Sequence, residues 1–256
     1  MKLKEYLDID LLHKMIEEKM VVLNYHPNGY LRILTYSKEC QGERIWNDVT
    51  EKCRGLIVDG DNNIIARPFK KFYNYEELVA DAFPIGKYLN ENMAFDAYEK
   101  LDGSLGIMYW IDDTPYIATK GSFTSEQALH ATELLHTKYR NVWNRLDRNK
   151  TFLFEIIYPQ DLHVVTYKDV DDIFLIGVLD NDDENTEYDI ESYCDIFNTT
   201  KKYLLAENWR SLREQIDGTN REGFVIRFAD GFRLKLKYED YWTLHYLKSG
   251  FSEKNI

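Results

Sequence analysis

The segment Glu99-Lys100-Leu101-Asp102-Gly103-Ser104 places a lysine at the end of an apolar strand and directly before a tight turn. A lysine amine becomes a nucleophile when burial or neighbouring cations destabilise its ammonium form. The glycine allows close approach of the backbone to a ligand, and the Asp102 carboxylate can tie the turn or help to hold a hydrated metal ion. Taken alone, this segment fits an exposed hairpin with a solvated lysine better than a nucleophile.

A second basic segment, Arg233-Leu234-Lys235-Leu236-Lys237, alternates cations with leucines. Alternate side chains of a strand share a face, so Arg233, Lys235 and Lys237 should point one way and the leucines into a core. Three cations on one face suit a polyphosphate and would lower the pKa of a nearby lysine. The alternative is an amphipathic strand with a solvated basic face. This alternative is less favoured, because the chain as a whole is strongly acidic.

Two carboxylates occur in strand contexts. Glu155 interrupts the apolar run 152–157, and Glu222 precedes Gly223-Phe224-Val225-Ile226. A carboxylate in an apolar run is costly unless it is paired, hydrogen-bonded or close to a metal ion. A structural salt bridge is the alternative at each position, and it is the weaker alternative at Glu222 because a glycine follows.

Further polar segments combine cations with aromatic residues or glycine. Arg54-Gly55 opens a hairpin that is followed by Lys71-Phe72-Tyr73-Asn74, and Lys120-Gly121-Ser122 precedes a helical stretch. Aromatic rings interleaved with lysines can stack a base while the cations contact phosphate. Buried rings beside surface lysines would produce the same pattern.

The elements that must position these residues are mostly strands. Helical spacing predicts helices over 8–19 and 125–146, with Ser125 as the N-cap of the second. Turn residues 27–29, 59–63 and 230–231 separate pairs of strands. Strands are also expected at 95–99, 105–111, 116–119, 152–158, 174–179, 223–228 and 232–238. Because no βαβ rhythm is present, the prediction is an α+β fold of largely antiparallel sheets with flanking helices.

Composition limits the function classes. The 256 residues carry a formal net charge of −12, which argues against binding to DNA or anionic lipid through a general basic surface and leaves room for a local basic pocket. Three cysteines match neither a disulfide framework nor a zinc motif. No signal peptide or membrane-spanning run is found, so we expect no membrane association and a cytoplasmic location, including a host cytoplasm if a phage or virus encodes the chain.

In order, Lys-x-Asp-Gly-Ser, a strand Glu, Glu-Gly before an apolar strand and Lys-x-Lys resemble the signature of the covalent nucleotidyltransferases. More narrowly, the chain resembles the family of the first RNA ligase of bacteriophage T4. The segments that carry this closer resemblance are Glu39-Cys40 to Cys53-Arg54-Gly55, Ala66-Arg67-Pro68, Lys71-Phe72-Tyr73-Asn74, Lys120-Gly121-Ser122, Ser125-Glu126-Gln127-Ala128-Leu129, Glu222-Gly223-Phe224-Val225, Asp230-Gly231, Lys235-Leu236-Lys237 and Leu244-His245.

The resemblance implies an adenylation domain of the covalent ligase fold, described as ATP-grasp-like, and an ATP-dependent RNA ligase activity. Lys100 would attack the α-phosphate of ATP, release pyrophosphate and retain AMP. The AMP would pass to the 5′-phosphate of RNA, and a 3′-hydroxyl would then displace it to seal the strands. ATP and Mg²⁺ or Mn²⁺ are the implied cofactors, and RNA with 5′-phosphate and 3′-hydroxyl ends is the implied partner, in RNA or tRNA repair.

The resemblance also assigns site residues. Lys100, Lys235 and Lys237 are expected to be catalytic, and Asp102, Glu155 and Glu222 to hold a metal ion or its waters. The expected nucleotide-binding residues are Arg54, Lys71, Tyr73, Glu99, Lys100, Gly103, Lys120, Glu155, Glu222, Val225, Lys235 and Lys237.

Two departures from the family pattern leave the function open. Leu101 stands where the T4 enzyme has an acidic residue, at a variable position. The sequence stops soon after the last motif, so residues 1–256 are expected to form one nucleotidyltransferase domain whose C-terminal partner domain is absent or truncated. One alternative is a DNA ligase or a GTP-using capping enzyme, against which the segments 54–73 and 120–129 argue. The other is a nucleotide- or RNA-binding module without chemistry, which would be expected to lack the nucleophile or the lysine pair, and neither is missing.

Overall fold

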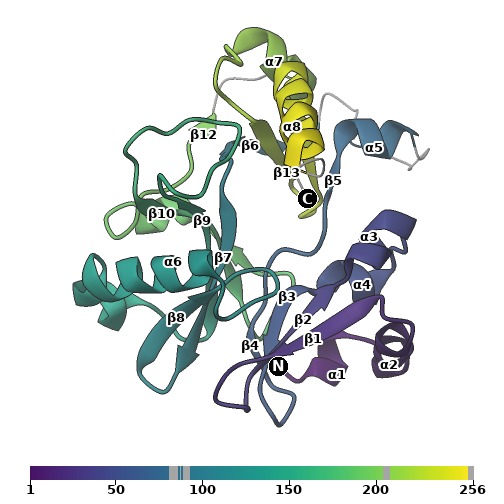
Figure 1. The fold of residues 1–256 in the computed structure, drawn as a ribbon, viewed down its shortest axis with the longest axis vertical. Coiled ribbons are helices and arrows are strands. Elements are labelled where there is room, and N and C mark those ends of the chain that lie inside the picture. The colour runs from purple at the N-terminus through teal and green to yellow at the C-terminus, as the bar shows by residue number, and fades with distance from the viewer. Residues whose placement is uncertain (81–85, 87, 89–92, 204–207, 253–256) are drawn as a thin grey trace. The chain divides into compact units, whose positions relative to one another are not determined.

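A computed structural model describes residues 1–80, 86, 88, 93–203 and 208–252 of the chain (Figure 1). The chain divides into two compact units. The first unit comprises Met1–Lys71, Ser104–Ile157 and Asp171–Thr199, and the second comprises Phe72–Gly103, Tyr158–Val170 and Thr200–Ile256. No helix in the described ranges is long and apolar enough to cross a membrane.

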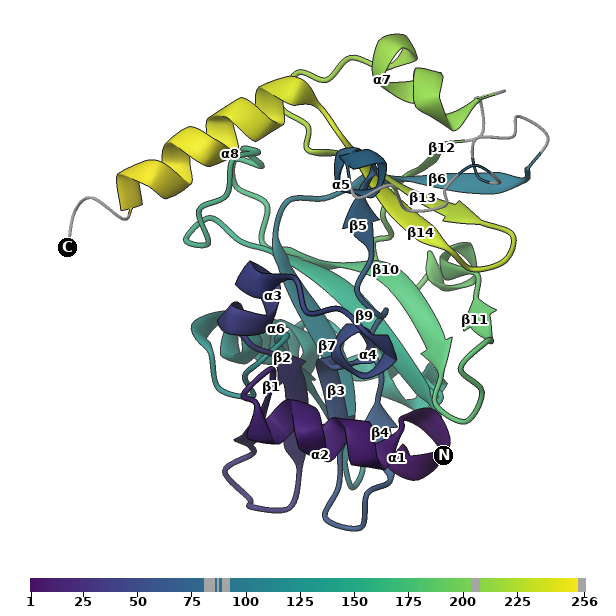
Figure 2. The ribbon, with the colours of Figure 1, turned by 90° about the vertical axis from the view of Figure 1, so that its right-hand side faces the viewer.

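The first unit begins with a four-stranded antiparallel sheet of order β1-β2-β3-β4. The predicted turns at 27–29 and 59–63 are confirmed as its two hairpin connections. One face of the sheet packs against the N-terminal helices through Leu12, Leu34 and Leu56 (Figure 2). The strands are β1 (Val21–Tyr25), β2 (Arg32–Tyr36), β3 (Arg54–Val58) and β4 (Ile64–Ala66), and the helices of this region are α1 (Leu3–Tyr6), α2 (Ile9–Glu17), α3 (Lys38–Glu43) and α4 (Asp48–Lys52).

The second sheet of the first unit has the order β11-β10-β9-β7-β8 and is also antiparallel. Its residues Ile107 and Leu153 pack against Ile33 and Ile57 of the first sheet, so the two sheets share a core. Helix α6 covers the β8 side (Figure 1). The elements are β7 (Ser104–Ile111), β8 (Thr114–Ala118), α6 (Glu126–Thr137), η2 (Arg140–Arg145), β9 (Lys150–Ile157), β10 (Asp172–Asp180), β11 (Glu187–Tyr188) and η3 (Ile190–Tyr193).

The single long helix expected over 125–146 is wrong in its second half. Ser125 is the N-cap, and its hydroxyl accepts a hydrogen bond from the Ala128 amide, but α6 ends at Thr137 and a 3-10 helix follows. The indole of Trp143 donates to the Leu135 carbonyl at 3.0 Å. In a continuous helix these residues would lie about 12 Å apart along the axis. The chain therefore folds back to bury Trp143, and this tertiary contact overrides the helical spacing.

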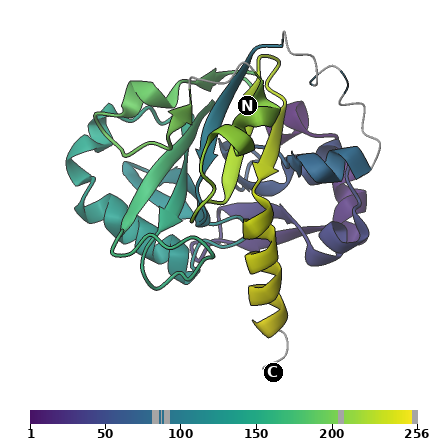
Figure 3. The same cartoon turned by 90° about the horizontal axis from the view of Figure 1, so that it is seen from above.

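The second unit contains one five-stranded sheet of order β12-β6-β13-β14-β5, in which only the described β14–β5 pair is parallel. Its core is formed by Phe224, Ile226, Leu234 and Leu236. Helix α8 leaves the end of β14 and continues away from this sheet (Figures 2 and 3). The elements are β5 (Tyr73–Asn74), α5 (Tyr75–Ala80), β6 (Phe95–Lys100), β12 (Lys202–Tyr203), η4 (Trp209–Ser211), α7 (Leu212–Gln215), β13 (Gly223–Phe228), β14 (Arg233–Lys237) and α8 (Glu239–Ser252).

The α+β prediction with largely antiparallel sheets is confirmed. Each predicted strand is present within two residues of its expected ends. The helix expected over 8–19 is present as α2, and its N-cap is Asp8, whose carboxylate accepts from the Leu11 amide. The sequence pattern did not predict helices α3, α4, α5 and α8. Three of these have only five or six residues, too few for a clear periodic signal.

Candidate active site

Three adjacent strands of the second unit meet at Gly223. This glycine pairs with Lys100 at the end of β6 and with Lys237 at the end of β14. Its φ of +146° is rarely adopted by other residues, and a Cβ here would lie 2.1 Å from the Leu236 carbonyl oxygen. Glycine at this position therefore allows the strands to bring the two lysines together.

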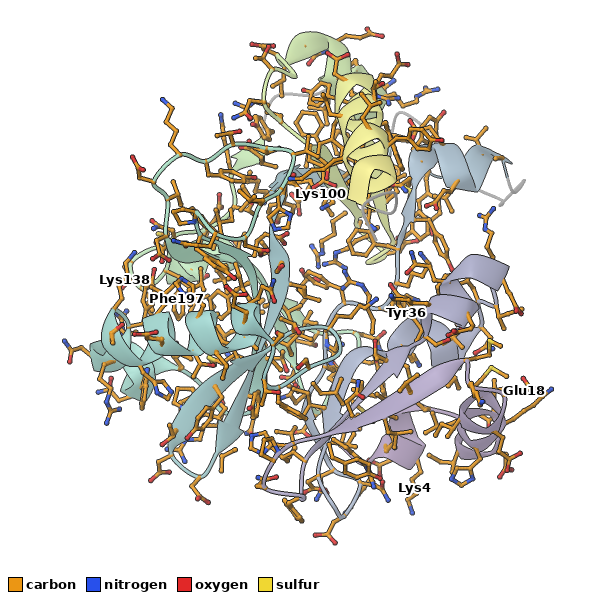
Figure 4. All side chains as sticks on the ribbon, viewed as in Figure 1. Lys4, Glu18, Tyr36, Lys100, Lys138 and Phe197 are labelled. Carbon is orange, nitrogen blue, oxygen red and sulfur yellow. The ribbon has the colours of Figure 1, made fainter. Side chains whose placement is uncertain are left out.

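Glu222 joins the two lysines. Its Oε2 accepts from Lys100 Nζ at 2.8 Å, and its Oε1 lies 2.7 Å from Lys237 Nζ. The carboxylate is only 3% exposed, so its two ammonium partners offset the cost of burying its charge. Figure 4 shows Lys100 in the second unit.

The arrangement is suited to an anionic reactant. Two ammonium groups share one carboxylate, which leaves a net positive charge beside the amine of Lys100. Fixed positive charge in a partly buried site stabilises negative charge that develops on a phosphoryl group. The distance of 2.8 Å between Glu222 Oε2 and Lys100 Nζ is short enough for the carboxylate to orient the amine or to exchange a proton with it.

Strand alternation places the remaining cations as predicted. Lys235 and Lys237 share one face of β14, while Leu234 and Leu236 point into the core. Lys235 pairs in register with the half-buried Val225. The Nζ of Lys235 lies 4.9 Å from the centre of the Phe72 ring. The predicted phosphate-facing lysines and Val225 therefore lie on the same face of the sheet as Lys100. Tyr73, on β5, packs against the core of the second unit.

Asp102 is bound by the protein itself. Its Oδ2 accepts from the amides of Val164 and Val165 at 2.9 Å each, and its Oδ1 accepts from the Tyr241 hydroxyl at 2.9 Å. The amide of Asp102 in turn donates to the Tyr167 hydroxyl at 2.7 Å. Asp102, which was expected to hold a metal ion, therefore connects the turn after Lys100 to the segment 158–170 and to α8. Gly103 is the next residue of that turn.

Glu99 points away from Lys100, because adjacent residues of a strand face opposite sides. Its carboxylate pairs with Arg221 at 2.6 Å, and the Arg221 guanidinium also donates to the Tyr203 hydroxyl at 2.7 Å. Burial lowers the pKa of Arg221, but the Glu99 carboxylate and Tyr203 outweigh it and raise the pKa above its usual value. The Glu99 side chain therefore has a structural partner, and its expected role in nucleotide binding stays a prediction.

Four expected nucleotide-binding residues belong to the first unit. Arg54 begins β3 and donates to the Phe69 carbonyl at 3.4 Å, and Glu155 lies on β9 opposite Phe174 of β10. The other two, Lys71 and Lys120, both lie against aromatic rings.

Lys71 and Lys120 lie at the two ends of a row that contains two aromatic rings between them. Lys120 Nζ lies 4.1 Å from the centre of the Tyr36 ring, and Lys71 Nζ lies 4.3 Å from that of Trp46. The two rings meet edge to face at 5.1 Å (Tyr36 is labelled in Figure 4). Sequence reasoning missed both rings. Their separation from the lysines along the chain left no local signal.

Tyr241 and Trp242 on α8 were also missed. Lys237 Nζ lies 4.8 Å from the centre of each ring. Burial, followed by the charges of Glu222 and Asp102, raises the pKa of Tyr241 far above its usual value, so its hydroxyl stays protonated as a donor. The available signal was the spacing: Tyr241 follows Lys237 by four residues.

The three carboxylates expected to hold a metal ion do not form a preassembled cage. Asp102 accepts three hydrogen bonds from protein groups, Glu222 pairs with two lysines, and Glu155 lies in the other unit. Among the residues that the structure describes, no three His, Cys, Asp or Glu side chains gather as a metal site. A divalent ion held mainly by protein ligands does not fit this arrangement.

The comparisons with known proteins concern the family and the fold. Residues 52–242 match the family described as RNA ligase. A protein of Autographa californica nuclear polyhedrosis virus, described as a bifunctional polynucleotide kinase/RNA ligase, is 26% identical over 225 residues, which cover 77% of this chain and 31% of that protein.

Solved structures show the same fold. A variant of the Naegleria gruberi RNA ligase with ATP and Mn has a TM-score of 0.53 and 20% identity, covering 68% of this chain and 56% of that one. An Aquifex aeolicus protein described as an ATP-dependent DNA ligase has a TM-score of 0.61 at 14% identity, with 96% and 72% covered. An archaeal ATP-dependent RNA ligase has a TM-score of 0.58 at 12% identity, with 97% and 74% covered.

The chain thus spans about a third of the viral relative and 56% of the Naegleria ligase structure. The family match covers most of the chain and includes the residues that build the site at Gly223. This chain belongs to the RNA ligase family.

Proposed function

We propose that this chain is the nucleotidyltransferase portion of an ATP-dependent RNA ligase. The observation that carries the proposal is the bridge from Lys100 through Glu222 to Lys237, which places an amine beside excess positive charge. In the first step the ammonium of Lys100 passes a proton to the Glu222 carboxylate, 2.8 Å away, and the Lys100 nitrogen attacks the α-phosphorus of ATP. A nitrogen–phosphorus bond forms, the bond to the β-phosphate oxygen breaks, and pyrophosphate leaves.

Two transfers complete the reaction. An oxygen of the RNA 5′-phosphate attacks the lysyl-AMP phosphorus and takes AMP, which restores the amine. The 3′-hydroxyl of the other strand then attacks the activated 5′-phosphate, forms the phosphodiester and releases AMP. Each step is a phosphoryl transfer, in which charge neutralisation and alignment supply most of the catalysis.

The roles of the remaining residues are proposed from their places in the ordered sequence motifs. Lys235 and Lys237 stabilise the α-phosphate, and Val225 packs on the adenine. The other nucleotide contacts are proposed for Tyr73, Glu99, Gly103, Arg54, Lys71, Lys120 and Glu155. Glu222 orients Lys100.

ATP is the proposed donor, and the Naegleria structure with ATP and Mn supports a nucleotide together with a divalent ion. We propose Mg²⁺ or Mn²⁺ as the ion. Mg²⁺ usually keeps several waters and binds through substrate phosphates with one or two carboxylates. The absence of a carboxylate cluster in the described residues is compatible with that mode.

The deciding experiment incubates the chain with α-³²P-ATP and Mg²⁺ and then separates it under denaturing conditions. Label should remain attached to the wild-type protein. It should be lost in Lys100→Arg, which keeps the charge but replaces the amine by a guanidinium that stays protonated. Lys168→Arg is a matched control, since Lys168 is an exposed lysine of the same unit. Persistent label in Lys100→Arg would refute the assignment of the nucleophile.

A DNA ligase is the second candidate, and the fold shared with the Aquifex protein favours it over a capping enzyme or a binding module without chemistry. Nicked duplexes that differ only in whether the 5′-phosphate strand is RNA or DNA separate the two ligase activities. Faster sealing or AMP transfer on DNA would replace RNA as the proposed substrate.

A further inference from the structure

We propose that the exposed face of Trp242, extended by Tyr246, is a stacking platform for the base of the RNA nucleotide that carries the 5′-phosphate. This inference rests on the proposed function and assigns a subsite to it. Helix α8 exposes both aromatic side chains, and Trp242 lies beside Lys237.

The position of Trp242 ties it to the site. The centre of its ring lies 4.8 Å from Lys237 Nζ, and Lys237 binds the carboxylate that holds Lys100. Trp242 directly follows Tyr241, whose hydroxyl donates to Asp102. Two sets of contacts therefore connect the Trp242 region to Lys100 and the turn that follows it. One runs through Lys237 and Glu222, and the other runs through Tyr241 and Asp102.

Both rings present accessible surface. Trp242 is 37% exposed and Tyr246 is 78% exposed. Residues four apart in a helix are neighbours, so the two side chains lie on the same face of α8. Lys237 Nζ lies over the Trp242 ring and supplies positive charge next to this face. An aromatic surface with an adjacent cation is the arrangement that binds single-stranded nucleic acid.

A single nucleotide fits both features. A phosphate near Lys237 and a base on Trp242 can belong to the same nucleotide, because a nucleotide carries both groups on one sugar. In the proposed second step an RNA 5′-phosphate must reach the AMP on Lys100, beside Lys237. The net charge of −12 disfavours broad electrostatic binding of RNA, so a local stacking contact would contribute a large share of the affinity.

The test compares two 5′-phosphorylated oligoribonucleotides that differ only in the presence of the 5′-terminal base. Binding is measured by fluorescence polarisation, and AMP transfer is measured from protein that is already adenylated. Trp242→Ala should weaken binding of the intact oligonucleotide and raise its KM roughly tenfold, as expected for loss of one stacked base. Trp242→Phe, which keeps a ring, should recover most of the loss. Leu244→Ala, an exposed residue on the same helix, is the matched control.

The decisive result is the dependence on the base. Trp242→Ala and wild type should bind the abasic oligonucleotide equally. An equal loss on both oligonucleotides, or a rise in the KM for ATP in place of the oligonucleotide, would overturn the inference. Failure of the wild-type chain to form an adenylate would count against the proposed function, whereas the polarisation measurement still decides the stacking platform.

Discussion

Lys100 and Lys237 bind opposite oxygens of the same carboxylate, that of Glu222, from the ends of two different strands. The relationship is created by Gly223, which pairs with both residues in the sheet. It makes the two lysines interdependent, because a change in either alters the charge balance around the same buried group.

Replacing Glu222 by Gln should abolish detectable self-adenylation and lower the free energy of unfolding by about 3 kcal/mol. That is the lower end of the range for a broken buried ion pair, since both lysines retain some solvent contact. Urea denaturation and labelling with ATP measure the two effects. Glu214→Gln removes an exposed carboxylate from the same unit and should change neither. Full labelling of Glu222→Gln would contradict the role of the bridge.

The alanine variants of Lys235 and Lys237 should lose similar amounts of activity but should differ in stability. Either alanine variant should slow adenylation at least about a hundredfold, as expected when a charge that stabilises the transition state is lost. Lys237→Ala should also lower stability, because it leaves the buried Glu222 carboxylate with one of its two lysine partners. Lys235→Ala, at a side chain that lies over the Phe72 ring, should lower stability less. Single-turnover kinetics and urea denaturation of both variants provide the comparison. Equal stabilities would argue against the ion pair between Lys237 and Glu222.

Asp102→Asn should lower the free energy of unfolding by about 2 kcal/mol, because charge-assisted hydrogen bonds from Val164, Val165 and Tyr241 are weakened or lost. Thermal or urea denaturation measures the change, and Asp169→Asn, at an exposed carboxylate of the same segment, is the control. If Asp102 acted only on a metal ion, the variant would keep wild-type stability in the absence of divalent ions.

Gly223→Ala should destabilise the protein by about 2–3 kcal/mol, because the new Cβ would overlap the Leu236 carbonyl and the residue would keep a positive φ. Gly231→Ala is the matched comparison. Its φ is +82°, but nothing lies within 4 Å of its Cβ, so it should incur only the backbone cost of about 1 kcal/mol. Denaturation midpoints that are the same for both variants would show that the close approach at Gly223 relaxes freely.

Alkaline pH should destabilise the wild type more than Tyr241→Phe. Burial and the nearby Glu222 and Asp102 carboxylates raise the pKa of Tyr241 in the folded state. Above about pH 10 the unfolded chain releases this proton while the folded protein keeps it, so stability falls by about 1.4 kcal/mol for each further pH unit. Urea denaturation between about pH 9 and pH 11 should show a shallower decline in Tyr241→Phe. Parallel declines would mean that Tyr241 ionises normally when folded.

The sequence by itself determined most of the strands and the family. Alternating leucines and cations over 233–237 specified which side of the strand is buried, because this pattern is local and has the period of a strand. Polar turns located the hairpins for the same reason. The ordered motifs carried the family resemblance, and through it the expectation that Lys100 is the nucleophile.

Only the tertiary structure decided how those residues are paired. By residue type Asp102 could hold a metal ion or tie a turn, and the hydrogen bonds that it accepts from Val164, Val165 and Tyr241 come from segments distant in sequence. The end of α6 at Thr137 likewise depends on a buried tryptophan. Hydrogen bonds and buried contacts between segments far apart in the chain leave no periodic pattern in the sequence. Only the folded structure therefore determines which of several chemically equivalent partners a side chain contacts.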